Sequence, residues 1–138
     1  ASVKATLIES IVRLLKIFHE RGFIHRDLKA PNLLVTWPSP YEGRPILTLI
    51  DMDGIRHVWR PTEGQQMRAL VRLCSSLLSS PGCTCTDRLR FLKGYLTGPG
   101  QTASKWKDVW RNIHVQVCEK LYAKEDRRKW KLAHYGRP

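Results

Sequence analysis

Two short stretches of the sequence hold side chains whose types and spacing could do chemistry. The first, FIHRDLKAPNLLV at residues 23–35, contains Asp27 and, five residues later, Asn32. The second, LTLIDMDGIRHV at residues 47–58, is an apolar run that ends abruptly at Asp51. Such a run suggests a short buried strand that delivers its last residue to a site. Carboxylate and amide oxygens are ligands that suit a hard cation such as Mg²⁺.

The order of these residues resembles the catalytic loop of the protein kinases. The sequence contains HRDLKxxN from His25 to Asn32, followed by Asp51. In protein kinases this pattern assigns a role to each of three residues. In that pattern one Asp takes or orients the proton of the attacking hydroxyl, while an Asn and a later Asp hold Mg²⁺ over the phosphates of ATP. The resemblance therefore implies that Asp27 is the catalytic residue. It also implies that Asn32 and Asp51 bind the cofactors, Mg²⁺ and ATP.

Four further residues receive roles from the same resemblance. Lys29 would put a positive charge beside the transferring group, where charge spreads in the transition state. Leu34 falls where kinases place the floor of the adenine site. His25 and Arg26 would be supports rather than reactants, the first packing under the metal-binding turn and the second tethering the activation segment.

The turn after the second apolar run departs from the protein-kinase pattern. Where protein kinases have Asp-Phe-Gly, this chain has DMDG from Asp51, so either Asp51 or Asp53 could face the metal. Two motifs resemble those of the lipopolysaccharide kinase family. They are LIDxDG followed by Arg56, and TDRLRFLKGYL at Thr86 to Leu96. These bacterial enzymes phosphorylate heptose or Kdo sugars of the lipopolysaccharide inner core. The resemblance implies an inner-core glycolipid as acceptor, at the cytoplasmic face of a Gram-negative-type inner membrane.

The elements that must position these residues begin with an expected amphipathic helix. Its apolar residues recur at steps of three and four over 4–21, and Gly22 suits the left-handed position just past its end. Residues 32–36 and 46–50 are expected to form a short antiparallel pair. The loop between them, 37–45, is rich in Pro and Gly and cannot extend either strand.

Aromatic residues near the expected site have two possible uses. Trp37 and Tyr41 could stack on a sugar, although simple loop packing is favoured. His57 and Trp59 are expected to pack, with acceptor contact as the alternative. They lie in the segment up to Pro61, which has the position of a kinase activation segment but is very short. A small-molecule or glycan acceptor fits that shortness better than a protein does.

Three further helices are expected after Pro61. Thr62 and Gln65 form a plausible capping box for a helix that runs to about Ser80. Thr86 is expected to cap a helix through Leu96. A last helix is expected from Ser104, fraying beyond Tyr122, with a core-facing stripe made of Trp106, Trp110, Ile113, Val117 and Leu121.

These elements predict one domain, residues 1–138, mainly α with a small β hairpin (α+β). Its parts are a helix (1–22), the catalytic loop, hairpin and metal-binding turn (23–61), and a helical subdomain (62–138). The fold resembles the C-terminal lobe of a protein-kinase-like fold. The Gly-rich loop, strand Lys and helix Glu of the other lobe have no counterpart before Phe23. The N-terminal lobe is therefore expected to be missing, and ATP binding without it is an open question.

The net charge of +12 leans toward the C-terminus, with +4 over residues 1–85 and +8 over 86–138. Such a balance attracts polyanions of several kinds. Arg127, Arg128, Lys129 and Lys131, beside Trp130, could lie on an anionic membrane surface at about 1 kcal/mol per basic residue, a solvated tail being the alternative. Nucleic acid is an unlikely partner, because no DNA- or RNA-reading motif occurs.

The cysteines and the hydropathy indicate in which cellular compartment the protein is expected. Cys74, Cys83, Cys85 and Cys118 have no CxxC spacing, so reduced thiols are expected rather than a zinc site or a disulfide. No apolar run reaches the roughly 20 residues of a membrane span, and no signal peptide is evident. We expect a cytoplasmic protein, soluble or peripheral on the inner membrane.

Three functions follow from this sequence. The first is an ATP-dependent phosphotransferase lobe that acts on an inner-core sugar hydroxyl. The second is a protein kinase or small-molecule kinase, which would share every catalytic residue. The third is an inactive pseudokinase or anion-binding fragment.

Overall fold

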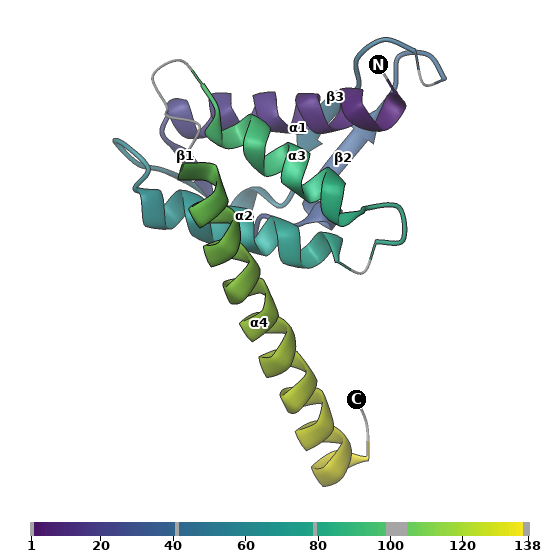
Figure 1. Ribbon diagram of the computed structural model, residues 1–138, viewed down its shortest axis with the longest axis vertical. Helices are drawn as coiled ribbons and strands as arrows, with labels where there is room; N and C mark the ends of the chain where they lie inside the picture. Colours follow the sequence, from purple (N-terminus) through teal and green to yellow (C-terminus); the bar gives the residue numbers. More distant parts are fainter. Residues whose placement is uncertain (1, 41, 79, 99–104, 137–138) are drawn as a thin grey trace.

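The computed structural model describes residues 2–40, 42–78, 80–98 and 105–136 (Figure 1). The described residues form four α-helices, α1 (Val3–Glu20), α2 (Glu63–Leu77), α3 (Cys85–Leu96) and α4 (Lys105–Tyr135). Their four short strands are β1 (Phe23–His25), β2 (Leu33–Thr36), β3 (Ile46–Leu49) and β4 (Ile55–His57). Two 3-10 turns are described, η1 (Ala30–Asn32) and η2 (Met52–Gly54). Asn32 lies in η1 and Asp53 in η2, and Asp51 is the N-cap residue of η2.

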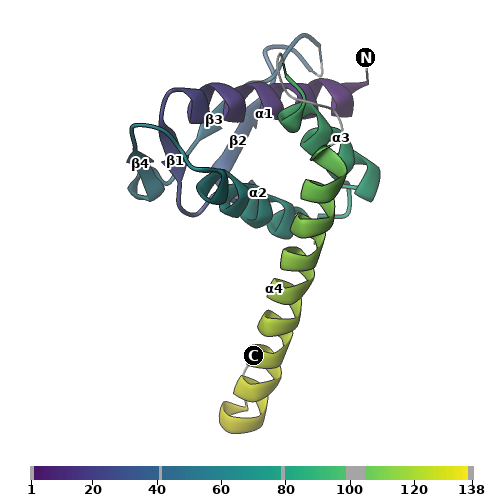
Figure 2. The ribbon, with the colours of Figure 1, turned by 60° about the vertical axis from the view of Figure 1, so that its left-hand side comes forward.

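The helices form a body from which one of them projects. α1 and α3 lie side by side and α2 lies below them, while α4 packs on α2 and α3 and then extends away (Figures 1 and 2). No helix among the described residues is both long enough and apolar enough to cross a bilayer.

The strands make two separate antiparallel pairs. β2 pairs with β3, with Leu33 opposite Leu49 and Thr36 opposite Ile46, as the sequence predicts. β1 pairs with β4, with Phe23 opposite His57, a pairing that the sequence analysis does not anticipate. The two pairs set the two predicted stretches next to each other.

Local chemistry fixes the ends of the first two helices. Gly22 follows α1 with φ +82°, and a Cβ there would stand 2.3 Å from the carbonyl oxygen of Val58, so the position requires glycine. The predicted capping box of α2 is present, since Thr62 Oγ1 accepts from the Gln65 N–H at 3.2 Å and the Gln65 side chain accepts from the Thr62 N–H at 2.9 Å. α2 ends at Leu77, earlier than the expected Ser80.

The predicted start of α3 is wrong by two residues. Thr84, not Thr86, is the N-cap, because a capping box needs a polar partner three residues on. Asp87 supplies that partner for Thr84, accepting from the Thr84 N–H at 2.9 Å, whereas Leu89 follows Thr86 at the same spacing.

The last helix is longer than predicted. It does not fray beyond Tyr122 but continues to Tyr135, because the sequence there is rich in good helix formers and has no Gly or Pro before Gly136. Within the predicted stripe, Ile113 and Val117 are buried but Leu121 is 43% exposed, since α4 has left the body by that point.

One core joins all four helices to the catalytic loop. Its fully buried side chains are Leu15, Leu28, Leu70, Val71, Leu73, Leu92 and Ile113. The predictions made for single aromatic residues have different outcomes. Trp59 is completely exposed rather than packed, and Tyr41 lies outside the described residues. His57 does pack, with its ring centroid 5.0 Å from that of Phe23.

Candidate active site

The catalytic loop runs from β1 to β2 and is fixed to the body from both sides. Leu28, in the middle of the loop, is fully buried in the core. Two residues later the Ala30 N–H donates to the Ser76 Oγ of α2 at 2.8 Å. Burying Leu28 leaves its neighbour Asp27 exposed at the surface of the loop.

Asn32 is the residue at which the two predicted stretches meet. Its buried Nδ2 donates to the carbonyl oxygen of Asp27 at 2.9 Å and to Oδ2 of Asp51 at 3.4 Å. Its own backbone carbonyl accepts from the Ile50 N–H at 2.9 Å. Asp27, Asn32 and Asp51 therefore lie in one place, although two of them are nineteen residues apart in sequence.

Asp51 reaches Asn32 through an uncommon backbone conformation. Its φ of 64° and ψ of 61° are left-handed, a region that Asp and Asn tolerate better than most residues. The turn closes with the Gly54 N–H donating to the Asp51 carbonyl at 3.1 Å. Asp53 is exposed in the same turn. The contact with Asn32 favours Asp51 over Asp53 as a ligand beside the catalytic loop.

His25 lies between the two turns and holds both. Its buried ring accepts at Nδ1 from the Asp27 N–H at 3.2 Å, so the proton is on Nε2, which donates to the Ile50 carbonyl at 3.2 Å. A Cβ on Gly54 would stand 2.6 Å from Cε1 of this ring. The side chain of Arg26 is exposed, but its backbone N–H donates to the Gly54 carbonyl at 2.7 Å. Gly54 must lack a side chain for the turn to pack this closely.

Lys29 and Asp27 form an ion pair at the mouth of the loop, with Lys29 Nζ 2.5 Å from Oδ2 of Asp27. The hydrogen bond from Lys29 lowers the pKa of Asp27, and the nearby Arg72 guanidinium lowers it further. The same hydrogen bond raises the pKa of Lys29. Asp27 is therefore a carboxylate at neutral pH, able to accept a proton, and Lys29 is an ammonium group beside it.

The donor set fits a magnesium-nucleotide complex better than a metal held by protein alone. Among the described residues, no group of three or more His, Cys, Asp or Glu side chains could hold a metal ion. Mg²⁺ bound to nucleotides commonly takes one or two carboxylates and completes its shell with phosphate oxygens and water. Asp51 and the amide oxygen of Asn32 match that requirement. Leu34, on β2, is half exposed.

Sequence reasoning missed two cations near this site, Arg72 of α2 and Lys120 of α4. Burial lowers the pKa of Lys120, the positive charge of Arg72 lowers it further, and Asp27 acts in the opposite direction. The charges of Arg72 and Asp27 therefore shift the pKa of Lys120 in opposite directions. The sequence indicates only the helix face of Lys120, which continues the spacing of Ile113 and Val117; it does not show which element that face meets.

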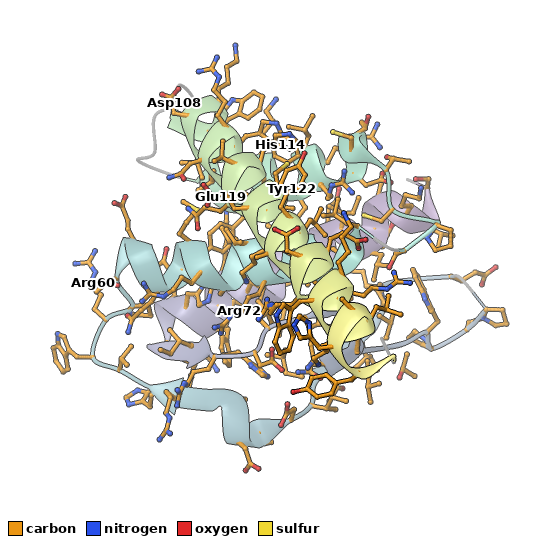
Figure 3. All side chains as sticks on the ribbon, turned by 90° about the horizontal axis from the view of Figure 1, so that it is seen from below. Arg60, Arg72, Asp108, His114, Glu119 and Tyr122 are labelled. Atoms are coloured by element: carbon orange, nitrogen blue, oxygen red, sulfur yellow. The ribbon has the colours of Figure 1, made fainter. Side chains whose placement is uncertain are left out.

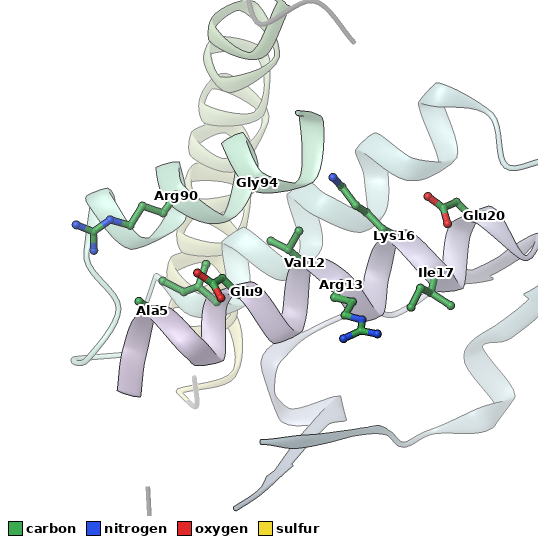
Figure 4. Close-up of a pocket in the computed structure, with 10 residues that line it drawn as sticks. Ala5, Glu9, Val12, Arg13, Lys16, Ile17, Glu20, Arg90 and Gly94 are labelled. Atoms are coloured by element: carbon green, nitrogen blue, oxygen red, sulfur yellow. The ribbon is translucent and has the colours of Figure 1, made fainter. Parts of the chain in front are cut away.

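Two cavities among the described residues lie away from the catalytic loop. A groove of about 640 Å³ runs between α1 and α3, where Val12 packs against Gly94 (Figure 4). A smaller cavity of about 250 Å³ lies among α2, α3 and α4, with Cys74 and Cys118 in its wall. The four cysteines are free thiols, and burial raises the pKa of the Cys74 thiol to about 12. None of the predicted site residues lines either cavity.

Comparison with known proteins places this geometry in a family. The model of the lipopolysaccharide kinase (Kdo/WaaP) family matches residues 1–95. No curated protein matches the chain. A solved structure, WaaP in complex with acyl carrier protein, is similar with a TM-score of 0.69 and 24% identity, covering 87% of this chain and 50% of that one.

The structural similarity concerns the fold, and the chain spans half the length of that WaaP chain. The predicted fold class is confirmed, since the molecule is mainly helical with small antiparallel sheets and superposes on part of a kinase of this family. The family match covers more than half of the chain, from α1 through α3, and includes both chemical stretches. The chain therefore belongs to the lipopolysaccharide kinase (Kdo/WaaP) family.

Proposed function

We propose that this chain is the catalytic lobe of an ATP-dependent kinase that phosphorylates a sugar hydroxyl of a lipopolysaccharide inner-core glycolipid. The observation that carries the proposal is the pair of hydrogen bonds from Asn32 to the Asp27 carbonyl and to the Asp51 carboxylate. These hydrogen bonds hold the proposed base, Asp27, close to the proposed metal ligand, Asp51. Catalysis of phosphoryl transfer depends mainly on such positioning of charged groups. Family membership supports the reaction class.

In the proposed reaction each residue has one task. Asp27 accepts the proton of the acceptor hydroxyl as the oxygen attacks the γ-phosphorus and the bond to ADP breaks. Asp51 and Asn32 would hold Mg²⁺, which when bound neutralises charge on the nucleotide phosphates. Lys29 is placed to stabilise negative charge on the transferring group once substrate separates it from Asp27.

The shape of the chain around the site supports a glycan acceptor. Only residues 58–62 separate β4 from α2, so no long activation segment lies over Asp27. A lipid-linked sugar also places the reaction at the cytoplasmic face of the inner membrane. In two-lobed kinases a second lobe completes nucleotide binding, and these 138 residues match half of the WaaP chain.

The test uses the full-length protein with Mg²⁺, radiolabelled ATP and purified inner-core glycolipid. Asp27→Asn should lower turnover by about 10²–10⁴-fold, since it removes the proton acceptor but keeps the shape. Asp108→Asn, which changes an exposed carboxylate of α4, is the matched control and should leave turnover unchanged.

Three outcomes would contradict the proposal. Unchanged turnover in Asp27→Asn removes Asp27 from its role. Transfer to protein serine or threonine, or to a small-molecule hydroxyl, with none to glycolipid, would make the protein a different kind of kinase. A full-length protein that neither binds Mg²⁺-ATP nor transfers phosphate would be a pseudokinase.

A further inference from the structure

One face of α4 changes from apolar to basic at the point where the helix leaves the body. Packing residues recur along this face at steps of four, three and four. The same spacing then continues through a basic stripe of five exposed cations, Lys120, Lys124, Arg127, Arg128 and Lys131. At about 100° of rotation per residue, the stripe occupies an arc of roughly 100°. That arc also contains the packing residues Val109, Trp110, Ile113 and Val117 and the half-buried Trp106.

The opposite charges of this half of α4 lie elsewhere on the helix. Glu119 and Asp126 fall on the side away from the basic stripe, and Glu125 lies beyond its edge. No carboxylate in the described part of the chain forms a salt bridge with any of the five cations. A merely solvated helix usually mixes the two signs so that pairs form at i,i+4. The five cations of the basic stripe are therefore not paired with carboxylates of the described residues, and they share one face of the helix.

The basic stripe begins three residues after the buried Val117 of α4, and α4 packs on α2. α2 also borders the catalytic loop, because its Ser76 Oγ accepts from the Ala30 N–H at 2.8 Å, and from there α4 extends away from the body (Figures 1 and 2). Arg72 of α2 is labelled in Figure 3; its positive charge contributes, after Lys29, to the lowered pKa of Asp27 and, after burial, to the lowered pKa of Lys120. From Lys120 to Lys131 the stripe is about 16 Å long, at 1.5 Å per residue.

The apolar residues of the projecting half do not suit a membrane-inserted helix. A helix that lies in the headgroup layer gathers its apolar side chains on one face. Here Leu121, Tyr122, Trp130 and Leu132 are scattered around the axis. Lys129, one of the four cations predicted from sequence to touch a membrane, also lies off the basic stripe.

We propose that the basic stripe of α4, together with Arg72, binds several phosphate or carboxylate groups of the acceptor and so holds its hydroxyl at Asp27. This inference rests on the proposed function and names the substrate class of that site, a polyanionic glycan. Lys and Arg supply charge-assisted hydrogen bonds to such groups, and the three arginines, Arg72, Arg127 and Arg128, can form bidentate ones. Anions spread over about 16 Å could be held at once.

The test compares two triple variants with the same loss of charge. The stripe variant is Lys124→Gln, Arg128→Gln, Lys131→Gln, and the control is Lys107→Gln, Arg111→Gln, Lys129→Gln, whose residues lie on other faces of α4. All six positions are exposed and Gln is a good helix former, so both variants should fold, which circular dichroism checks. The probe is a deacylated, multiply phosphorylated inner-core oligosaccharide, titrated against the 138-residue chain.

The stripe variant should bind this oligosaccharide at least about tenfold more weakly, the effect of losing one charge-assisted hydrogen bond, while the control changes little. In the full-length kinase it should raise KM for the acceptor and leave KM for ATP unchanged. Equal weakening by both variants would overturn the inference. So would tighter binding to phosphatidylglycerol vesicles or to duplex DNA than to the oligosaccharide. An absence of phosphoryl transfer would instead refute the proposed function, because the binding comparison needs no turnover.

Discussion

Asn32 shows how one buried amide can organise a site from two segments. An unpaired buried amide is costly, so its two hydrogen bonds also fix the positions of their acceptors. Those acceptors belong to Asp27 and Asp51. The side chain therefore has a structural task as well as the proposed ligand role, and its amide oxygen is the atom left for a cation.

At the scale of single residues, Gly54 offers a test of how closely the two turns must pack. In Gly54→Ala the added methyl would meet the His25 ring at about the 2.6 Å given above, so the ring must shift. Both ring hydrogen bonds then weaken, and Asp27 moves relative to Asp51. Since a misplacement of 1 Å can cost about 10²-fold in rate, turnover of the full-length kinase should fall by roughly that factor.

Gly82→Ala is the control for this change, because a Cβ at Gly82 meets nothing within 4 Å. Steady-state kinetics and urea unfolding of both variants would separate rate from stability. Wild-type turnover in Gly54→Ala would show that the contact with His25 does not position the site.

Sequence reasoning brought Asp27, Asn32 and Asp51 together but missed Arg72 and Lys120. The first three follow from the resemblance of HRDLKxxN and the later Asp51 to the kinase catalytic pattern. The other two lie on α2 and α4, and their approach to Asp27 depends on how these helices cross. That crossing is decided by tertiary packing, which no local pattern encodes.

At the scale of elements, a buried hydrogen-bond chain ties three helices together. His19 of α1 lies with Nδ1 2.6 Å from the hydroxyl of Tyr95 in α3, and that hydroxyl donates to the Gln66 Oε1 of α2 at 3.4 Å. The other ring nitrogen of His19, Nε2, has no hydrogen-bond partner among the residues that the structure describes. Burial lowers the pKa of His19, so the ring is neutral in the folded protein.

This linkage predicts a pH dependence of stability. The unfolded state has the higher His19 pKa, near 6.5, and so binds more protons as pH falls. The contribution of His19 is therefore fully present above about pH 6.5 and is lost as pH falls toward its lower folded pKa, with a slope of at most about 1.4 kcal/mol per pH unit. Urea unfolding at pH 7.5, 6.5 and 5.5 measures it.

In His19→Gln that part of the pH dependence should disappear. His134→Gln, at an exposed position near the end of α4, should retain it. Parallel profiles for His19→Gln and the unmodified chain would mean that another group controls stability in this range.

The elements that were predicted well are those with a strong local signal. α1, α2 and the β2–β3 pair follow from periodicity, a capping box and a Pro- and Gly-rich loop. β1 and β4 are only three residues long, too short for a periodic pattern, and they form because the core brings them together. The end of α4 was misjudged because a run of charge was taken as a frayed tail, although its residues are good helix formers.

At the scale of the whole molecule, the catalytic loop and the helices share one core. Leu28 lies in this core together with Leu15, Leu70 and Leu92. Leu28→Ala should therefore lower the free energy of unfolding by about 2–5 kcal/mol, the range for a buried Leu. Urea unfolding followed by circular dichroism and by tryptophan fluorescence should give one coincident transition.

Leu132→Ala, on the exposed part of α4, is the control and should change stability by less than about 0.5 kcal/mol. If Leu28→Ala behaved like this control, or if the two probes gave different midpoints, the loop would be a separate unit from the helical core.

The dimensions of α4 affect how the molecule moves in solution. With 31 residues the helix is about 46 Å long, whereas a compact chain of this size has a diameter of roughly 37 Å. A projecting helix increases the frictional coefficient and slows diffusion. A monomer would therefore elute early in gel filtration, at an apparent mass closer to that of a dimer. Its subunit count is better taken from light scattering or sedimentation equilibrium, which weigh particles independently of shape.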